Sequence, residues 1–373
     1  MACPPKRRRI VSRTFGIEEE FFLFDAHTYS MAALSPEQSA LLLDLNAQVH
    51  PGNVQTEFLA AQIEIATAVF QDAEMALEQL RATRQLLLAR CQQIGVFPAA
   101  LGTPPALPAQ PAQITDARRY DLVQQLVPGL AAEHYLSGMH IHIGIPDLQS
   151  GVRALNGLRH WLPVLTAMSS NSPFWRGQDT GFASWRTIQY RRWSINGIPP
   201  HFPDAASYRS HQKLLLGSES LLDAGHIGWS ARLSEKFPTI EIRASDVQMT
   251  SGEAVALAVL VRAVVDTVLD HPPVPPTASS EALQLALWQA ARSGLQGKLL
   301  EASTGENVPA MDHVGTLLDY ASGALRANGD ESRVQAAVAK WQENGTGAQR
   351  QRSAWFSGGH KAVLDLAREH FDQ

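Results

Sequence analysis

The chain has 373 residues, of which 45% are hydrophobic and 18% are charged, and its formal net charge is −5 with histidine counted as neutral. A chain of this composition buries a sizeable core and is not disordered. The negative charge argues against a dedicated nucleic-acid binder, because such proteins neutralise phosphates with a dominant basic surface.

The N-terminal segment, the most apolar window and the cysteines indicate in which compartment the protein is expected. A dense basic run at 6–9 predicts a flexible basic tail over residues 1–13, with no apolar stretch typical of a signal peptide. The most apolar window, 254–269, contains two charged residues and is too short to span a membrane. Cys3 and Cys91 are poorly placed for a structural disulfide. We therefore expect a cytoplasmic protein without membrane or nucleic-acid partners, and the oligomeric state stays open, a homo-oligomer included.

The first elements are two strands and a helix. Alternating residue character predicts strands over 15–24 and 62–67. A helix should begin after Asp72, whose side chain can cap it, and stop at Gly95. A proline-rich stretch, 103–111, then predicts a loop.

Two more strands follow, separated by helical sequence. The third strand is predicted over 139–145 and the fourth over 239–244. Between them, an apolar stripe from Leu155 to Met168 predicts one helix with a kink near Pro163.

The remaining sequence predicts helices. The segment 252–270 is apolar almost all round and predicts a buried helix. Prolines at 272–276 mark a boundary inside a single domain, 14–373, that is mixed over 14–271 and wholly helical over 277–373. Connections of unequal length favour an α+β fold with an antiparallel sheet and helices packed on one face, rather than a doubly wound repeat.

The four predicted strands share a polar face. Residues two apart in a strand point to the same side, so Glu18 and Glu20 share one face and Glu19 points to the other. The same alternation adds further residues to the polar face: Gln62, Glu64, His140, His142, Glu241 and Arg243. The opposite face is lined by isoleucines: Ile17, Ile63, Ile65, Ile141, Ile143, Ile240 and Ile242.

The residue types on this face indicate metal and phosphate chemistry. Each charged pair alone is more typical of a solvated strand, but ordinary solvent faces mix lysine, threonine and serine with acids. Carboxylates from several strands suit Mg²⁺, and two imidazoles among them would instead suit Mn²⁺, Zn²⁺ or Fe²⁺. Arg243, beside Glu241, supplies a cation where a transferring phosphoryl group builds charge. There is no Walker loop and no Gly-x-Ser-x-Gly elbow.

A polar stretch rich in glycine and aromatic residues, 171–186, has two possible interpretations. Its arginines could hold phosphate, or the stretch could be a compact loop packed by its own side chains. The residues favour neither reading.

The ordered motifs resemble the type 2 glutamate–cysteine ligase family, also called YbdK-like carboxylate–amine ligases. The matching motifs are 16–20, Glu57 with 62–65, 138–144, 172–186, 229–232, 237–243 and 345–352. The similarity runs from about Thr14 to Phe371, in the same order throughout. The resemblance implies a glutamine-synthetase-like fold, in which a curved antiparallel sheet holds ATP, Mg²⁺ and an amino acid on its concave face.

The resemblance also implies a reaction and a set of site residues. ATP phosphorylates a substrate carboxylate, typically the γ-carboxyl of glutamate, and an amine then displaces the phosphate to form an amide. Mg²⁺ is the implied cofactor, with Mn²⁺ as an alternative. The implied metal ligands are Glu18, Glu20, Glu57, Glu64, His142 and Glu241. The implied catalytic residues are Arg243, Glu241 and Arg232, and the implied substrate- or nucleotide-binding residues are Arg186, Arg232, Asp179, Trp229 and Arg352.

Two departures from the family pattern concern the substrate. The stretch 102–105 lacks a histidine that family members commonly have before a proline, and Leu233 replaces a common proline. Glutamate as the donor is unproven, and the acceptor amine is not identified by any residue. Two alternatives remain: a non-catalytic relative that binds nucleotide or amino acid, and a metal-dependent hydrolase that uses His140 and His142.

Overall fold

The computed structural model describes residues 12–271 and 277–373. An antiparallel sheet of seven strands lies at its centre, in the order β10-β11-β5-β1-β3-β2, with β4 paired to β1. Its strands are β1 (Phe15–Asp25), β2 (Asn53–Thr56), β3 (Gln62–Ala66), β4 (Val96–Ala99), β5 (Gly138–Gly144), β10 (Ala231–Leu233) and β11 (Thr239–Asp246). The predicted α+β class with an antiparallel sheet is confirmed.

The four strands expected from the sequence are β1, β3, β5 and β11. The sequence did not predict β2 and β4, which have four residues each and are too short to show an alternating pattern. β4 also contains Pro98, which is atypical of a strand. Both pair with longer strands, so tertiary contacts rather than local preference make them strands.

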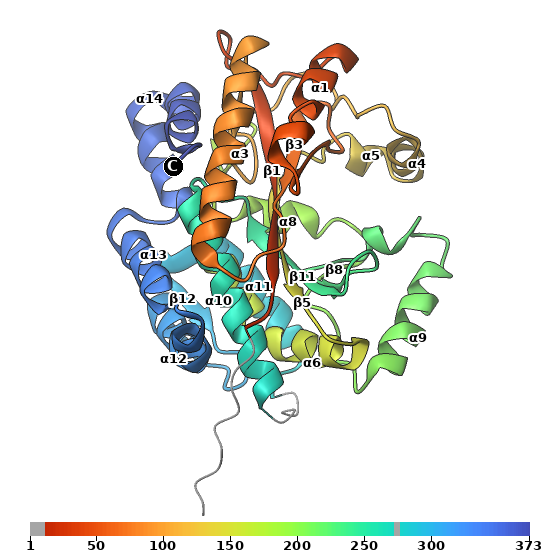
Figure 1. The fold of residues 1–373 in the computed structure, drawn as a ribbon, viewed down its shortest axis with the longest axis vertical. Helices are drawn as coiled ribbons and strands as arrows, with labels where there is room; N and C mark the ends of the chain where they lie inside the picture. Colours follow the sequence, from red (N-terminus) through yellow and green to blue (C-terminus); the bar gives the residue numbers. More distant parts are fainter. Residues whose placement is uncertain (1–11, 272–276) are drawn as a thin grey trace, which may run out of the picture.

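Two long helices cover the isoleucine face of the sheet. α3 (Ala73–Gln93) begins where the Asp72 carboxylate accepts hydrogen bonds from two backbone N–H groups, and the chain turns away at Gly95, whose φ is +74°. α10 (Ser251–Asp270) is buried along nearly its whole length, as predicted. In Figure 1 both helices run along β1, and all seven isoleucines of this face are buried in the same core.

The prediction of a single kinked helix before the fourth strand was wrong. The stretch from Leu155 to Met168 is not one kinked helix: it belongs to α6 (Leu148–Leu158) and α7 (Leu162–Met168). Pro163 lies in the first turn of α7, where its missing N–H has no helical partner to lose, so it starts a helix instead of bending one.

The C-terminal part is not wholly helical. A hairpin of β12 (Lys298–Leu300) and β13 (Asn307–Pro309) interrupts it, and Gly305, with φ +78°, lies in the turn. The helices of this part are α11 (Ser280–Ser293), α12 (Ala310–Asn328), α13 (Glu331–Asn344) and α14 (Gly347–His370). The predicted boundary at 272–276 lies outside the described residues.

Shorter elements complete the fold. The remaining helices are α1 (Pro36–Leu43), α2 (Asn46–Val49), α4 (Arg118–Leu126), α5 (Pro128–Ala131), α8 (Trp185–Tyr190) and α9 (Ala205–Leu216). The remaining strands are β6 (Phe174–Trp175), β7 (Gln178–Asp179), β8 (Asn196–Gly197) and β9 (Gly228–Trp229). Among the described helices, none combines the length and apolarity that crossing a bilayer requires.

The polar face of β1 is polar over only part of its length. Phe22 and Phe24 follow Glu18 and Glu20 on the same side of the strand, and they are buried in a second core with Phe97 of β4 and side chains of α14. The acidic half of the strand therefore ends at an apolar wall, which limits the site to the β3–β1–β5–β11 part of the sheet.

At the N-terminus, residues 1–11 of the predicted tail lie outside the described residues. Arg13, the last residue of that prediction, is held by an ion pair of 2.6 Å with Asp266 of α10. The Asp266 carboxylate also accepts a hydrogen bond from Asn328, so the chain is attached to the helical layer before β1 begins.

A buried ion pair lies behind the sheet. Glu19, on the isoleucine side of β1, accepts two hydrogen bonds from Arg84 of α3, at 2.6 and 3.0 Å, and neither side chain is exposed. The same guanidinium donates to the backbone carbonyls of Gln248, Met249 and Phe371. Arg84 therefore ties α3, β1, the start of α10 and the C-terminal end together.

Replacement of Arg84 by methionine should lower the free energy of unfolding by about 3–5 kcal/mol, because it leaves the Glu19 carboxylate buried without a partner. Urea unfolding measures this loss. The matched control is Arg81→Met, at an exposed position of the same helix, which should change stability by less than about 0.5 kcal/mol. Equal stability of the two variants would contradict the role given to the ion pair.

Candidate functional site

The strand register brings the predicted polar residues together. Glu18 of β1 lies opposite His140 of β5, and His142 of β5 lies opposite Glu241 of β11. Ligand-type atoms of Glu18, His140 and Glu241 all lie within 4.8 Å of one another, and we call this group the imidazole cluster. Its three members come from three adjacent strands.

A second group lies beside it. Glu20 of β1 is opposite Glu64 of β3, and Glu57 arrives from the connection between β2 and β3. One carboxylate oxygen of each lies within 4.8 Å of the others, and we call this group the carboxylate cluster. Gln55 of β2 donates a hydrogen bond to Glu64, a contact that the sequence did not predict.

The negative charge of the carboxylate cluster is not balanced by the cations around it. Burial raises the pKa of Glu64 well above its ordinary value, and the charges of Glu18, Glu57 and Glu20 raise it further. Burial and Glu20 raise the pKa of Glu57 to about 7. Three carboxylates this close repel one another unless protons or a cation separate them. The group therefore fits a hard divalent cation such as Mg²⁺, which prefers oxygen ligands.

His140 connects the two clusters. Its Nδ1 lies 3.2 Å from Glu18 and 3.8 Å from Glu241, and its Nε2 lies 3.8 Å from Glu20. Burial and the charge of Arg243 lower the pKa of His140, so the ring is neutral and offers a lone pair. The sequence analysis placed His140 on the polar face but not among the implied metal ligands. The alternation of His140 with His142 in the strand was the signal that could have added it.

His142, the predicted ligand, lies at the edge of the imidazole cluster. Its Nδ1 is 2.9 Å from the Thr239 hydroxyl and its Nε2 is 3.3 Å from Glu18. Burial would raise the pKa of Glu18, but the imidazoles of His140 and His142 beside it outweigh burial and hold that pKa well below the ordinary range. The contact of His142 Nε2 with Glu18 lacks hydrogen-bond geometry, so the Nε2 atoms of both histidines are buried without a hydrogen-bond partner among the described residues. Buried ring nitrogens of this kind fit the role of metal ligands.

Two arginines hold Glu241. Arg232 of β10 binds it through Nε at 2.8 Å and Nη2 at 3.2 Å, and Arg243 binds it through Nη1. Burial would raise the pKa of Glu241, yet the two guanidinium charges hold it well below the ordinary value. The carboxylate is therefore ionised and oriented.

The two arginines differ in what they leave free. Arg232 also donates to three backbone carbonyls in the segment 224–227, at 2.9 to 3.2 Å, so most of its donors are used inside the protein. Arg243 donates to the Tyr190 hydroxyl at 3.3 Å, but its Nε is buried and unpaired among the described residues. Arg243 is thus the better placed of the two to meet a ligand.

Arg186 lies next to Arg243. It is 5% exposed, its Nη1 donates to the Arg243 carbonyl at 3.3 Å, and its Nε is buried without a partner among the described residues. A side chain at Gly138 would come within 2.2 Å of the guanidinium, so only glycine leaves room for it. Arg186, Tyr190 and Arg243 line a small recess.

Three other predicted binding residues contact protein groups. Asp179 and Arg352 form a two-point ion pair, at 2.7 and 2.9 Å, and no hydrogen bond or ion pair links them to either cluster within the described ranges. Trp229 is 4% exposed and stacks on His211, with ring centroids 5.9 Å apart. The structure thus places Trp229 in aromatic packing against α9, and the ion pair joins Asp179 of β7 to Arg352 of α14.

Asp246 holds the stretch 171–186 in place, a role that the sequence did not predict. This buried carboxylate, at the end of β11, accepts from the Asn171 backbone N–H at 2.8 Å and from the Ser172 and Ser184 hydroxyls at 2.7 and 2.9 Å. The loop is therefore compact and packs on the sheet, with Arg186 beside Arg243, and the binding of phosphate by its arginines stays a prediction.

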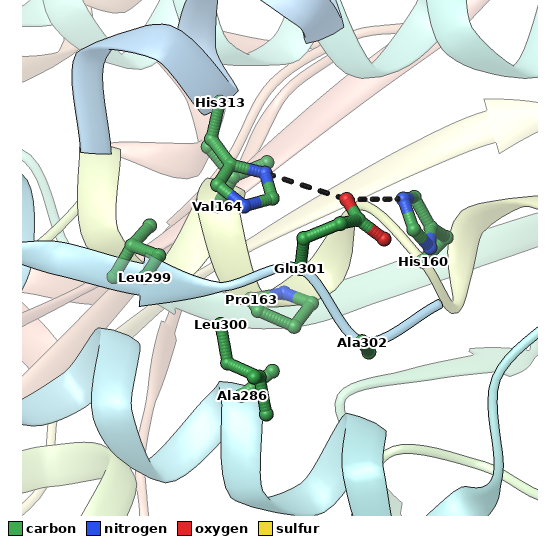
Figure 2. Close-up of a pocket in the computed structure, with 9 residues that line it drawn as sticks. All are labelled: His160, Pro163, Val164, Ala286, Leu299, Leu300, Glu301, Ala302 and His313. Carbon is green, nitrogen blue, oxygen red and sulfur yellow. Dashed lines mark ion pairs between the residues drawn. The ribbon is translucent and has the colours of Figure 1, made fainter. Parts of the chain in front are cut away.

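A second recess lies away from the sheet face (Figure 2). His160, at the end of α6, and His313 of α12 flank Glu301, which follows β12, at 3.3 and 3.9 Å. The walls are otherwise mainly apolar, with Pro163, Val164 and Leu299 among them. This histidine–glutamate–histidine group joins the connection between α6 and α7 to two elements of the C-terminal part, and it is separate from both clusters.

The geometry can be compared with known proteins. The family described as Glutamate-cysteine ligase family 2 (GCS2) matches residues 14–364. A protein of Saccharopolyspora erythraea named "Putative glutamate--cysteine ligase 2-1" is 38% identical over 343 residues, which cover 92% of this chain and 90% of that one. A protein of Mycobacterium sp. (strain KMS) named "Putative glutamate--cysteine ligase 2-2" is 36% identical over 362 residues, covering 95% and 98%.

A solved structure shows the same fold. Glutamate–cysteine ligase from Francisella tularensis, crystallised in complex with AMP, superposes with a TM-score of 0.73 at 13% identity, over 97% of this chain and 89% of that one. This likeness confirms the glutamine-synthetase-like fold expected from the sequence. The chain belongs to glutamate–cysteine ligase family 2, and it is an ATP-dependent carbon–nitrogen ligase.

Proposed function

We propose that the protein joins the side-chain carboxylate of an amino acid, with glutamate as the first candidate, to an amine through an acyl phosphate formed from ATP. One observation carries this proposal: two acidic clusters on the polar sheet face lie beside Arg243, whose Nε has no partner among the described residues. Acids that can hold metal, next to a free cationic donor, suit phosphoryl transfer, which needs positioning and charge neutralisation more than a protein nucleophile.

The metal would be held by the two clusters. Glu20, Glu57 and Glu64 would bind one Mg²⁺, and Glu18, His140 and Glu241 a second, with His142 at its edge. Mn²⁺ fits the imidazole cluster as well, because it accepts nitrogen ligands. When bound, the metal neutralises phosphate charge and aligns the phosphate oxygens. The solved ligase of the same fold was crystallised with AMP, which supports nucleotide binding by this chain.

The reaction has two steps. A carboxylate oxygen of the amino acid attacks the γ-phosphorus of ATP, and ADP leaves. The amine nitrogen then attacks the carbonyl carbon, phosphate leaves and the nitrogen loses a proton. Arg243 would neutralise charge on the transferring group, and Arg186, buried beside it, would bind an oxygen of the phosphate or of the substrate carboxylate.

The other predicted site residues would position the groups that contact the substrate or the metal, without contacting either themselves. Arg232 would orient Glu241, because most of its donors already bind that carboxylate and the segment 224–227. Arg352 would keep Asp179 and the loop after β7 in one conformation, at the edge of the site. Trp229 would support β10 through packing.

Isotope transfer tests this proposal. The protein is incubated with ATP, Mg²⁺ and pairs of amino acids, and ADP and amide products are measured by mass. With glutamate labelled by ¹⁸O in its γ-carboxylate, one labelled oxygen should appear in the released phosphate, because the carboxylate oxygen leaves on phosphorus. ADP without amide from any pair, or unlabelled phosphate, would overturn the mechanism, and amide hydrolysis without ATP would indicate a hydrolase.

Replacement of Glu64 by glutamine separates metal binding from stability. Without metal, the variant should melt a few degrees higher than the wild type, because one repelling charge is gone. Mg²⁺ should raise its melting temperature less than that of the wild type, and ligase activity should fall at least about tenfold. Glu78→Gln, an exposed site on α3, makes the same charge change as a control. A variant with full activity and full stabilisation by Mg²⁺ would exclude Glu64 as a ligand.

The carboxylate cluster also predicts how stability depends on pH. The pKa of Glu57 is about 7 in the folded chain, above the ordinary 4.5. The folded state therefore binds this proton more tightly, and the stability it contributes is present below pH 4.5 and lost as pH rises through 7. The metal-free protein should lose melting temperature across this range, and saturating Mg²⁺ or the Glu57→Gln substitution should flatten the slope. An unchanged slope in both would contradict the assignment.

A further inference from the structure

His134 has one ring nitrogen committed and one free. It lies after α5, and the indole Nε1 of Trp193 donates a hydrogen bond to its Nδ1 at 3.2 Å, with the rings edge to face at a centroid distance of 5.1 Å. An indole nitrogen can only donate, so His134 Nδ1 must be the acceptor and the ring proton sits on Nε2. Among the described residues, no hydrogen bond reaches Nε2.

This histidine stands beside the proposed site. The ring of Phe58, the residue after Glu57 of the carboxylate cluster, lies 5.4 Å from it. On another side the ring of Tyr190 lies 6.2 Å away, and the Tyr190 hydroxyl accepts a hydrogen bond from Arg243. His134 therefore lies between the residues that border the acids and those that contact the arginines.

The charges around His134 are positive. Burial and the nearby charges of Arg186, Arg192 and Arg243 lower its pKa to about 3, so the ring is neutral at any working pH. Arg192 is paired with Glu133 at 2.6 Å, whereas Arg186 and Arg243 each have a buried Nε that is unpaired within the part of the chain that the structure describes. These two Nε–H groups thus have no acceptor among the described residues, and the acceptor that suits a cationic surrounding is an oxyanion.

We propose that His134 is a substrate-binding residue whose fixed Nε2–H donates a hydrogen bond to an oxyanion of the bound substrate, and that Trp193 is a positioning residue that holds this tautomer. The inference rests on the proposed function for the identity of the oxyanion, which is either a phosphate oxygen of ATP or a carboxylate oxygen of the amino acid. A neutral donor suits this place because it adds a hydrogen bond without adding charge beside Arg243.

The tautomer can be measured without turnover. In protein labelled with ¹⁵N-histidine, His134 should show an unprotonated Nδ1 and a protonated Nε2. Titration with inorganic phosphate, ATP with Mg²⁺, or glutamate should shift the Nε2 signal and leave Nδ1 in its acceptor state. A protonated Nδ1, or an Nε2 signal unchanged by all three ligands, would overturn the proposal. This readout stands even if no amino acid pair yields ADP, so the two proposals fail separately.

Kinetics distinguish the two sources of the oxyanion. His134→Phe keeps a ring but removes the donor, and it should raise one KM by about tenfold or more; His134→Gln keeps an N–H near Nε2 and should lose less. A change confined to the KM for ATP identifies phosphate, and a change confined to the amino acid identifies a carboxylate. If both variants keep both KM values within about twofold, or if both lose equally, His134 has only a packing role and the proposal is wrong.

Trp193→Phe tests the positioning role. It removes the indole donor but keeps an aromatic ring, so the ¹⁵N spectrum should show a mixture of His134 tautomers and the same KM should rise by a smaller factor than in His134→Phe. Trp288→Phe, on α11 and 37% exposed, is the control and should leave both unchanged. An unmixed Nε2–H tautomer in Trp193→Phe would show that Trp193 does not position the ring.

Discussion

The buried ion pair between Glu19 and Arg84 decides which way β1 faces, and the site depends on that choice. A shift of one residue would move Glu19 onto the polar face and send Glu18 and Glu20 into the core. Arg84 opposes such a shift because its guanidinium binds Glu19 and also the carbonyls of Gln248, Met249 and Phe371. The polar face of the sheet therefore rests on a salt bridge on its other side, where no substrate reaches.

On the polar face of the sheet, most carboxylates lie on one side and the arginines lie on the other. Carboxylates gather on β1, β3 and the connection between β2 and β3, whereas the free cationic donors, Arg186 and Arg243, lie at the β11 side. The crowded acids are unfavourable without a cation, as the raised pKa of Glu57 and Glu64 shows. In the proposed function, a substrate with phosphate oxygens would bridge the two sides, because its oxygens are acceptors for the arginines and could be ligands for a metal. The cost to stability of crowding these acids is thus a consequence of the proposed chemistry.

Some of the arginines around the site shape it, and others are available to a ligand. Arg232 donates its hydrogen bonds to Glu241 and to backbone carbonyls, so its proposed role is to orient that carboxylate. Arg186 and Arg243 are packed into position yet keep unpaired donors, and His134 adds a neutral donor beside them. Groups held in this way need little reorganisation when charge develops on a substrate, which is the basis of electrostatic catalysis.

The sequence by itself determined the four longer strands, their isoleucine and polar faces, and the separation of Glu19 from Glu18 and Glu20, because side-chain alternation in a strand is a local property. It also predicted the buried helix α10. Only the tertiary structure decided that His140 bridges the two clusters, that Arg232 binds the protein while Arg243 keeps a free donor, and that Asp246, Arg84 and His134 support the site. Those contacts join residues far apart in the chain, and their distances follow from strand register and helix packing, which no local pattern specifies.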